Sequence, residues 1–266
     1  MTATNSKKIK TDTTYSVPGL ERGLAILEYL AEHPEGKSQN EISEELKCPA
    51  ASVFRMTLSL EKAGYLVRNP KTKAFRHTMK MLMLGQKAIS EIDLVGNSLP
   101  VMRTLRDHLH DTVALGVLNE TEIIVLESVL GSHLFRFSLT SGHRICLHAS
   151  APGKAILGFL PEDQRNRILQ NMELVKYNQN TITSQKAFQH ELASVREKGY
   201  SVDRGEEYAS IYCLGAPIFD RNGYPVAAIW VTGPDNRVKP SQYPSIGEQI
   251  REGALEISRV LGYQGR

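Results

Sequence analysis

Apolar side chains recur at helical spacing in three segments near the start of the chain. The first segment, residues 19–32, predicts a helix whose inward positions are Leu20, Leu24, Leu27, Leu30 and Ala31. The second, residues 38–46, opens with a capping-box pattern, in which the hydroxyl of Ser38 and the carboxylate of Glu41 each bond the other residue's amide. Pro49 interrupts the pattern, and a third helix then runs to residue 63. Its buried stripe consists of Val53, Met56, Thr57 and Leu60.

A short hairpin is predicted after the third helix. Gly64 ends the helix, and residues 65–68 are rich in strand-forming side chains. Residues 69–72 contain Asn-Pro and predict a turn, after which residues 73–77 return antiparallel. Two helices joined by a tight break and followed by a hairpin are typical of a winged helix-turn-helix. The second helix of such a pair fits the major groove of DNA.

The outward side chains of the third helix are the candidates for contact with base edges: Ala51, Ser52, Phe54, Arg55 and Ser59. Arg55 suits a guanine or a phosphate, and Phe54 suits a thymine methyl group. The alternative is that Phe54 and Leu58 pack on a neighbouring helix or on a partner chain. The predicted DNA-binding set also includes Ser38. It is completed by four residues predicted to contact the phosphate backbone: Arg22, Lys71, Lys73 and Arg76. For the wing, the alternative is a solvated basic turn.

Residues 79–92 carry a further helical pattern. Its apolar stripe is Met81, Leu84, Ala88 and Ile92. The position of this segment between two dissimilar halves favours a linker helix. A stripe containing methionine is adaptable and suits pairing between two copies of the chain. Packing within its own chain is the alternative.

From residue 93 onwards the pattern mixes helices and strands. Helices are predicted at 95–110, at 152–160, from residue 161, at 185–198 and at 241–261. Strands are predicted at 112–119 and 122–129, which form a hairpin, and at 135–139, 145–148, 200–203, 209–219 and 225–232. Helices grouped around an antiparallel sheet give the class α+β.

Several patterns in this second half resemble catalytic motifs. The segment from Ser150 to Lys154 lacks the residues that a phosphate-binding P-loop needs at positions 148 and 155. Ser150 does not lie in a Gly-x-Ser-x-Gly elbow. The remaining candidates for a metal or nucleophile site are His143, Cys146, His148, Asp203 and Cys213, without the paired spacing typical of zinc sites. The preferred interpretation is that these residues line a pocket, with no catalytic residue, cofactor or metal.

A pocket for a small molecule is the more attractive interpretation. The loop at residues 148–153 runs into the start of a helix, where the backbone amides of Ala151, Pro152 and Gly153 would lie, although proline has no amide hydrogen. A helix start favours a carboxylate or another anion. Nearby strands supply polar and aromatic lining: Asp203, Tyr208, Cys213, Trp230 and Thr232.

Composition adds a charge asymmetry. The chain has 266 residues, of which 41% are hydrophobic and 23% charged, ordinary values for a globular protein with room for two domains. Residues 1–80 hold 13 Lys and Arg against 9 Asp and Glu, a net charge of +4, so the remainder carries −1 of the total of +3. The positive half is the one with the predicted helix-turn-helix, which favours DNA binding.

Three further expectations come from composition. No run reaches the roughly 18 apolar residues of a membrane span. The polar, basic start of the chain lacks the apolar core of a signal peptide, so a cytoplasmic protein with a disordered arm is expected. The three cysteines are far apart and do not indicate a disulfide framework.

The order of these features resembles the IclR family of bacterial transcriptional regulators. The matching segments are residues 20–27, 52–55, 60–66, 148–155, 199–203, 213–220 and 226–229. The resemblance implies a winged helix-turn-helix, a linker helix and a GAF-like effector domain. It also implies homodimers or homotetramers on palindromic operators, and an organic-acid or sugar-acid effector. By position, its effector contacts fall on Ala151, Pro152, Asp203, Cys213, Trp230 and Thr232, where Trp230 is a departure that reshapes the pocket.

The resulting prediction is a ligand-responsive transcription factor, a repressor of a catabolic operon. Its domains are an arm (1–16), a winged helix-turn-helix (17–77), a linker helix (78–92) and an effector domain (93–263). The alternative is a metal-dependent sensor or enzyme that uses Cys213, His148 and Asp203.

Overall fold

The hydrophobic patterns of the two halves fold separately in the computed structural model, which describes residues 17–89 and 93–265. The chain divides into an N-terminal unit up to residue 91 and a C-terminal unit from residue 92. The predicted arm at residues 1–16 and the predicted end of the linker helix at residues 90–92 lie outside the described residues. Among the described residues, no helix combines the length and the apolar character that crossing a membrane requires.

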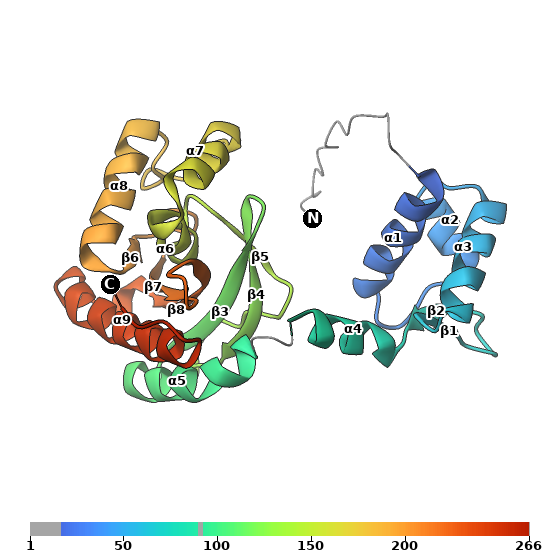
Figure 1. Ribbon diagram of the computed structural model, residues 1–266, viewed down its shortest axis with the longest axis horizontal. Coiled ribbons are helices and arrows are strands. Elements are labelled where there is room, and N and C mark those ends of the chain that lie inside the picture. Colours follow the sequence, from blue (N-terminus) through green and yellow to red (C-terminus); the bar gives the residue numbers. More distant parts are fainter. Residues whose placement is uncertain (1–16, 90–92, 266) are drawn as a thin grey trace. The chain divides into compact units, whose positions relative to one another are not determined.

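Within residues 17–89, three helices precede a two-stranded antiparallel hairpin, and a fourth helix follows it (Figure 1). The helices before the hairpin are α1 (Pro18–Ala31), α2 (Gln39–Glu45) and α3 (Ala50–Lys62), and the hairpin pairs β1 (Leu66–Arg68) with β2 (Phe75–His77). Helix α4 (Met79–Ile89) comes last. The predicted winged helix-turn-helix is therefore present, with element ends within two residues of the prediction.

The capping box that the sequence predicts fixes the start of α2. The Glu41 amide donates to Ser38 Oγ at 3.4 Å, and the Ser38 amide donates to Glu41 Oε2 at 2.7 Å. Behind this turn, one apolar cluster joins the three helices to the hairpin; its buried members are Ile26, Leu30, Ile42, Val53, Leu66 and Phe75. This cluster sets which face of α3 remains outside.

The predicted inward face of α1 is wrong in part. Leu20 and Leu24 are 61% and 50% exposed, whereas Ile26 and Leu30 are 1% exposed. Helix α1 carries leucines on more than one face, and contact with α3 and β2 selects the face of Ile26 and Leu30. The α4 stripe is also open at Leu84, and the side chain of Ala88 lies outside the described residues.

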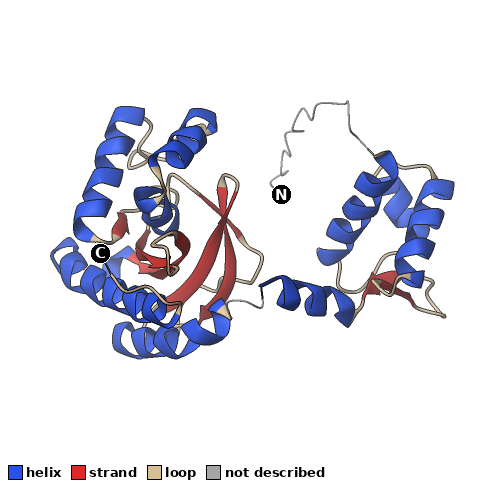
Figure 2. Ribbon diagram, in the orientation of Figure 1, coloured by secondary structure: helices blue, strands red, loops and turns tan. Residues whose placement is uncertain are grey.

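A six-stranded antiparallel sheet is the centre of the C-terminal unit (Figure 2). Its order is β5-β4-β3-β8-β7-β6. The strands are β3 (Thr112–Asn119), β4 (Glu122–Val129), β5 (Arg144–Cys146), β6 (Ser201–Asp203), β7 (Ile211–Phe219) and β8 (Pro225–Pro234). The helices are α5 (Leu94–Leu109), α6 (Ala151–Phe159), α7 (Glu162–Asn171), α8 (Gln185–Lys198) and α9 (Tyr243–Val260), with short 3-10 turns at Asp235–Arg237 and Pro240–Gln242. This is the predicted α+β class.

Each face of the sheet has its own core because successive strand residues point to opposite sides. Val113, Leu115 and Ile229 belong to the core under α5 and α9. Ala114 and Trp230 belong to the core under α6 and α8. Strand β8 therefore delivers the indole of Trp230 to the α6 face.

The hairpin of β3 and β4 is confirmed at the predicted bounds, but the strand predicted at residues 135–139 is wrong. That segment has irregular backbone. The hydroxyl of Thr112 donates to the Phe137 carbonyl at 2.7 Å, and that of Ser128 donates to the Leu139 carbonyl at 2.6 Å. Side chains of the hairpin thus hold the segment in place without a strand ladder.

Candidate functional site

Helix α3 presents most of the predicted base-contacting side chains to solvent. Ala51, Arg55 and Ser59 are exposed, and Phe54 is 46% exposed. Leu58, one turn after Phe54, is 51% exposed, so neither side chain is buried within the described residues. An exposed aromatic side chain beside an arginine suits the mixed apolar and hydrogen-bonding character of base edges in the major groove.

The prediction for Ser52 is wrong, because this residue is 5% exposed. Its hydroxyl accepts a hydrogen bond from Arg22 Nη1 at 3.2 Å. Ser52 therefore orients Arg22 at the α1–α3 contact and does not face outward. Ser38 has its hydroxyl engaged in the α2 cap.

The three cationic side chains predicted to contact phosphates from the wing lie at the surface. Asn69 Oδ1 accepts from the Lys71 amide at 2.9 Å and from the Thr72 amide at 3.2 Å, which fixes the turn. Lys71, Lys73 and Arg76 are exposed. Within residues 17–89, the ion pairs join Lys37 to two glutamates and involve none of these cations. The wing is therefore free to neutralise phosphates.

A cavity of about 170 Å³ lies in the C-terminal unit, on the α6 face of the sheet. It is bounded by the start of α6, by strands β6, β7 and β8, and by the irregular segment before β5. Six of the residues proposed for the effector pocket from the sequence line it: Pro152, Asp203, Tyr208, Cys213, Trp230 and Thr232. We call this cavity the effector pocket.

Strand pairing explains why residues so far apart in the sequence meet here. Cys213 lies opposite Asp203 in β6 and opposite Thr232 in β8. The Cys213 thiol donates to Thr232 Oγ1 at 3.2 Å. Trp230 is flanked by Ala114, which carries only a methyl group, and by Gly215, which has no side chain, and both leave room for its indole. The antiparallel register thus places a carboxyl, a thiol, a hydroxyl and an indole around one cavity.

The structure does not support the prediction that the α6 start offers several free amides. Pro152 has no amide hydrogen, and the Gly153 amide donates to Ser150 Oγ at 3.3 Å. Neither Ala151 nor Gly153 lines the effector pocket. A side chain placed on Gly153 would lie 2.0 Å from the Leu147 carbonyl oxygen, so this glycine serves close packing of the loop.

The electrostatics of the pocket centre on Asp203. Burial raises the pKa of its carboxyl to about 7, against the opposing charge of Lys154 and the hydrogen bond from the Glu206 amide. That amide donates to Asp203 Oδ1 at 2.8 Å. Lys154 is fully buried, and its ammonium group donates to the Val202 carbonyl at 2.5 Å and pairs with Glu206 at 2.5 Å and Glu191 at 3.3 Å. At neutral pH, Asp203 is therefore poised to act as donor or acceptor.

The sequence analysis missed part of the pocket wall. Apolar lining comes from Phe137, Leu139, Ile145 and Ile211, and polar lining from Ser138, His143, Arg144, Ser150 and Glu207. The alternating apolar pattern of residues 135–139 was the available signal. This alternation does not form a strand. Its apolar side chains, among them Phe137 and Leu139, cover the cavity instead.

The structure does not bring together the Cys213, His148 and Asp203 of the alternative metal or enzyme hypothesis. Cys213 and Asp203 line the effector pocket, whereas His148 lines a neighbouring cavity. No cluster of three or more potential metal ligands occurs within residues 17–89 and 93–265. The constellation that this hypothesis requires is not formed.

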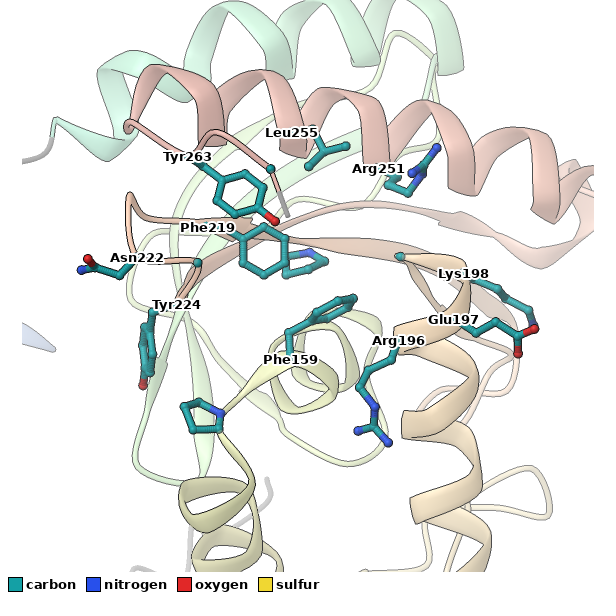
Figure 3. A pocket seen from close by; sticks show the side chains of 15 residues that line it. Phe159, Arg196, Glu197, Lys198, Phe219, Asn222, Tyr224, Arg251, Leu255 and Tyr263 are labelled. Atoms are coloured by element: carbon teal, nitrogen blue, oxygen red, sulfur yellow. The ribbon is translucent and has the colours of Figure 1, made fainter.

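A wider cavity of about 860 Å³ lies between the ends of α6, α8 and α9 (Figure 3). Phe159, Phe219 and Tyr263 form its aromatic wall, with ring centres 5.3 Å and 5.0 Å apart, and Arg196 and Arg251 lie around it. It shares no lining residue with the effector pocket. The effector pocket is the better candidate because buried polar groups from several strands converge on it, although it is the smaller of the two cavities.

Comparison with known families agrees with this division of the chain. The model described as the IclR helix-turn-helix domain matches residues 19–70, and the model described as the bacterial transcriptional regulator IclR C-terminal domain matches residues 86–259. The transcriptional repressor IclR of Escherichia coli K12 is 29% identical over 94% of this chain and 92% of its own length. The repressor AllR of Klebsiella pneumoniae is 31% identical over 91% of this chain and 89% of its own length.

Solved structures share the fold. The Thermotoga maritima IclR structure superposes with a TM-score of 0.73 at 28% identity, covering 92% of this chain and 98% of that one. An IclR homologue from Microbacterium hydrocarbonoxydans, solved as a complex with 4-hydroxybenzoate, superposes with a TM-score of 0.80 at 22% identity. It covers 91% of this chain and 98% of its own.

Replacing Lys154 with methionine is expected to lower the free energy of unfolding of the C-terminal unit by about 3–5 kcal/mol, because it leaves the buried Glu206 carboxylate without its cation. Urea unfolding followed by fluorescence of the single tryptophan, Trp230, measures the change. The matched control is methionine at exposed Lys186, which is expected to have little effect. Adding Glu206→Leu to Lys154→Met should recover part of the loss. A Lys154→Met protein as stable as the control would contradict this account.

Proposed function

The chain belongs to the IclR family of bacterial transcriptional regulators, and from that membership we propose that it represses a catabolic operon and responds to a small organic acid. One observation carries the proposal. The same chain exposes a helix-turn-helix with a basic wing and, in a separate unit, encloses a small pocket with buried polar groups. A DNA-binding regulator acts where the chromosome lies, so the proposed location is the cytoplasm.

Operator recognition is assigned to α3 and the wing. Arg55 and Phe54 contact base edges, with Ala51 and Ser59 beside them on the exposed face. Arg22, held by Ser52, contacts the phosphate backbone together with the wing residues Lys71, Lys73 and Arg76. Ser52 and Ser38 support this surface from behind.

Arg55→Ala is expected to cost about 1–3 kcal/mol of binding free energy on the operator and to relax the preference at one base position. Lys71→Ala should weaken binding to all sequences and reduce the salt slope by about one. Both effects are measured by salt titrations on an operator selected from random duplexes. Lys186→Ala, a lysine of the C-terminal unit, is the matched control. If both variants bind like this control, the assigned DNA surface is wrong.

We propose that the protein binds a palindromic operator as a homodimer or homotetramer. One winged helix covers a single half-site, and two copies related by symmetry add their binding energies. The exposed apolar side chains of α4, among them Met79, Leu82, Met83 and Leu84, are a plausible pairing surface. Sedimentation at micromolar concentration is expected to show dimers or tetramers, and a purely monomeric protein would contradict this proposal.

The ligand class follows from the size and lining of the effector pocket. A dry cavity of about 150 Å³ accepts a benzene ring, so about 170 Å³ suits one ring or a short chain. Trp230 offers an aromatic wall, Arg144 offers positive charge for a carboxylate, and Asp203 and Thr232 offer partners for a hydroxyl. The Microbacterium homologue was solved as a complex with 4-hydroxybenzoate, a one-ring hydroxy acid, which supports the proposal. We therefore propose a small, anionic hydroxy acid, aromatic or sugar-derived.

Binding of such an acid is expected to strengthen as the pH falls through 7. With its pKa raised to about 7, Asp203 is about nine-tenths protonated at pH 6 and about one-tenth at pH 8. The protonated carboxyl is neutral and donates a hydrogen bond, whereas the carboxylate repels the anion. An acid that needs the protonated form binds about tenfold more tightly at pH 6 than at pH 8.

Trp230 fluorescence titrations with a panel of small carboxylates, 4-hydroxybenzoate included, test this expectation. Asp203→Asn should flatten the pH dependence. His143→Gln, which changes another polar lining residue and leaves Asp203 in place, serves as the control and should retain the pH dependence that Asp203 causes. An acid that binds equally well in Asp203→Asn, Thr232→Ala and Trp230→Ser would place the effector site elsewhere.

A further inference from the structure

A cysteine and a histidine form a close pair beside the effector pocket. Cys146, at the end of β5, places its sulfur 3.2 Å from Nδ1 of His148. The ring of Tyr177 stacks on the His148 imidazole, with ring centres 5.8 Å apart. The proposed function uses none of these three side chains.

The backbone fixes which imidazole nitrogen faces the thiol. His148 Nε2 lies 3.0 Å from the carbonyl oxygen of Val175. A carbonyl oxygen only accepts, so Nε2 carries a hydrogen and donates it. Nδ1 is then the free base in the neutral imidazole, and it points at the Cys146 sulfur. A nucleophilic thiol needs a base oriented in this way by a third group.

Both pKa shifts favour the charged pair. Burial alone would raise the pKa of the Cys146 thiol, but the hydrogen bond with His148 and the Tyr177 side chain hold it below its usual value. Burial would lower the pKa of His148, but the hydrogen bond and charge of Cys146 raise it. The thiolate–imidazolium state therefore persists to lower pH than for an ordinary cysteine.

The pair borders a cavity. Cys146 is half-buried and His148 is 2% exposed, and both line a cavity of about 340 Å³ together with Tyr177, which is 44% exposed. The charged residues around the cavity are Glu122, Arg144, Glu173 and Glu207, and Glu206 acts on His148 from behind. The cavity is polar and roomy enough for a small oxidant such as hydrogen peroxide.

We propose that Cys146, activated by His148, is a site of oxidation by hydrogen peroxide. The thiolate attacks one peroxide oxygen, so that a sulfur–oxygen bond forms and the oxygen–oxygen bond breaks. The sulfur is oxidised by two electrons to a sulfenic acid, and the leaving hydroxide takes the proton from the His148 imidazolium to become water. Arg144 and Glu207 line both this cavity and the effector pocket, but the oxidation does not depend on what the effector pocket binds.

The other two cysteines are internal controls because each lacks an imidazole partner. Burial raises the pKa of the Cys213 thiol well above its usual value, and this thiol donates to Thr232. The Cys48 thiol donates to the Leu46 carbonyl at 3.3 Å. The three cysteines therefore differ in reactivity within one molecule.

The test measures modification of each cysteine in the full-length protein by mass spectrometry, with iodoacetamide across pH 5–9 and with hydrogen peroxide plus dimedone. Cys146 is expected to react at least about tenfold faster than Cys48 at pH 6.5, with its half-maximal rate at lower pH, and to be the main dimedone adduct. His148→Gln should slow Cys146 to the rate of Cys48. Tyr177→Phe should slow it less, because the stacked ring is kept.

Two results would overturn the proposal. One is a wild-type pH profile in which Cys146 reacts no faster than Cys48, a measurement that needs no variant. The other is an unchanged Cys146 rate in a His148→Gln protein whose Trp230 fluorescence shows it to be folded.

Discussion

The ammonium group of Lys154 is fully buried, so its hydrogen-bond acceptors must come from the protein itself. They lie on β6, on the loop that follows it and on α8. These acceptors are the Val202 carbonyl of β6, Glu206 in the loop after β6, and Glu191 of α8. Because an unpaired buried charge is so costly, these segments cannot move apart independently. Lys154 lies on α6 two residues after Pro152, and Val202 precedes Asp203 on β6, so the ammonium group ties together two walls of the effector pocket. The same charge also limits how far burial raises the pKa of Asp203.

The pocket and the DNA surface lie in different units, and each is built on a rigid element. Trp230 and Thr232 project from the central strand β8, and Arg55 projects from α3, whose other face is packed in a core. A ligand changes DNA binding only if it binds two conformations with different affinity. To change the ratio of the two conformations by about ten-thousandfold, the ligand must bind one of them about 5.5 kcal/mol more tightly than the other. The convergent polar groups around Trp230 are where such a difference can arise, because hydrogen bonds in a closed pocket are sensitive to small displacements.

The sequence predicted the elements well where local chemistry decides, and less well where packing decides. The capping box at Ser38 and the β3–β4 hairpin depend on neighbouring residues, and both were found. Ser52 was predicted to face outward because it lies off the apolar stripe of the helix, yet a donor from another helix, Arg22, lets it be buried. Phe137 was assigned to a strand, because alternation alone does not distinguish a ladder from a segment held by the hydroxyls of Thr112 and Ser128. Of the pocket residues that the family resemblance implies, all but Ala151 line the cavity. Gly153, which was predicted from the helix start, does not line it because its backbone packs against Leu147.

The central claim is that occupancy of the effector pocket and DNA affinity are linked. Linkage is reciprocal, so the most direct measurement is the affinity of the best-binding acid for free protein and for protein saturated with operator, by Trp230 fluorescence. Saturating acid changes the affinity of the protein for its operator by some factor. The affinity of the acid for free protein and its affinity for the operator complex are expected to differ by that same factor. For a repressor released by its effector, the acid binds the operator complex more weakly. Equal affinities for the two forms, with the acid bound in the pocket, would contradict the account.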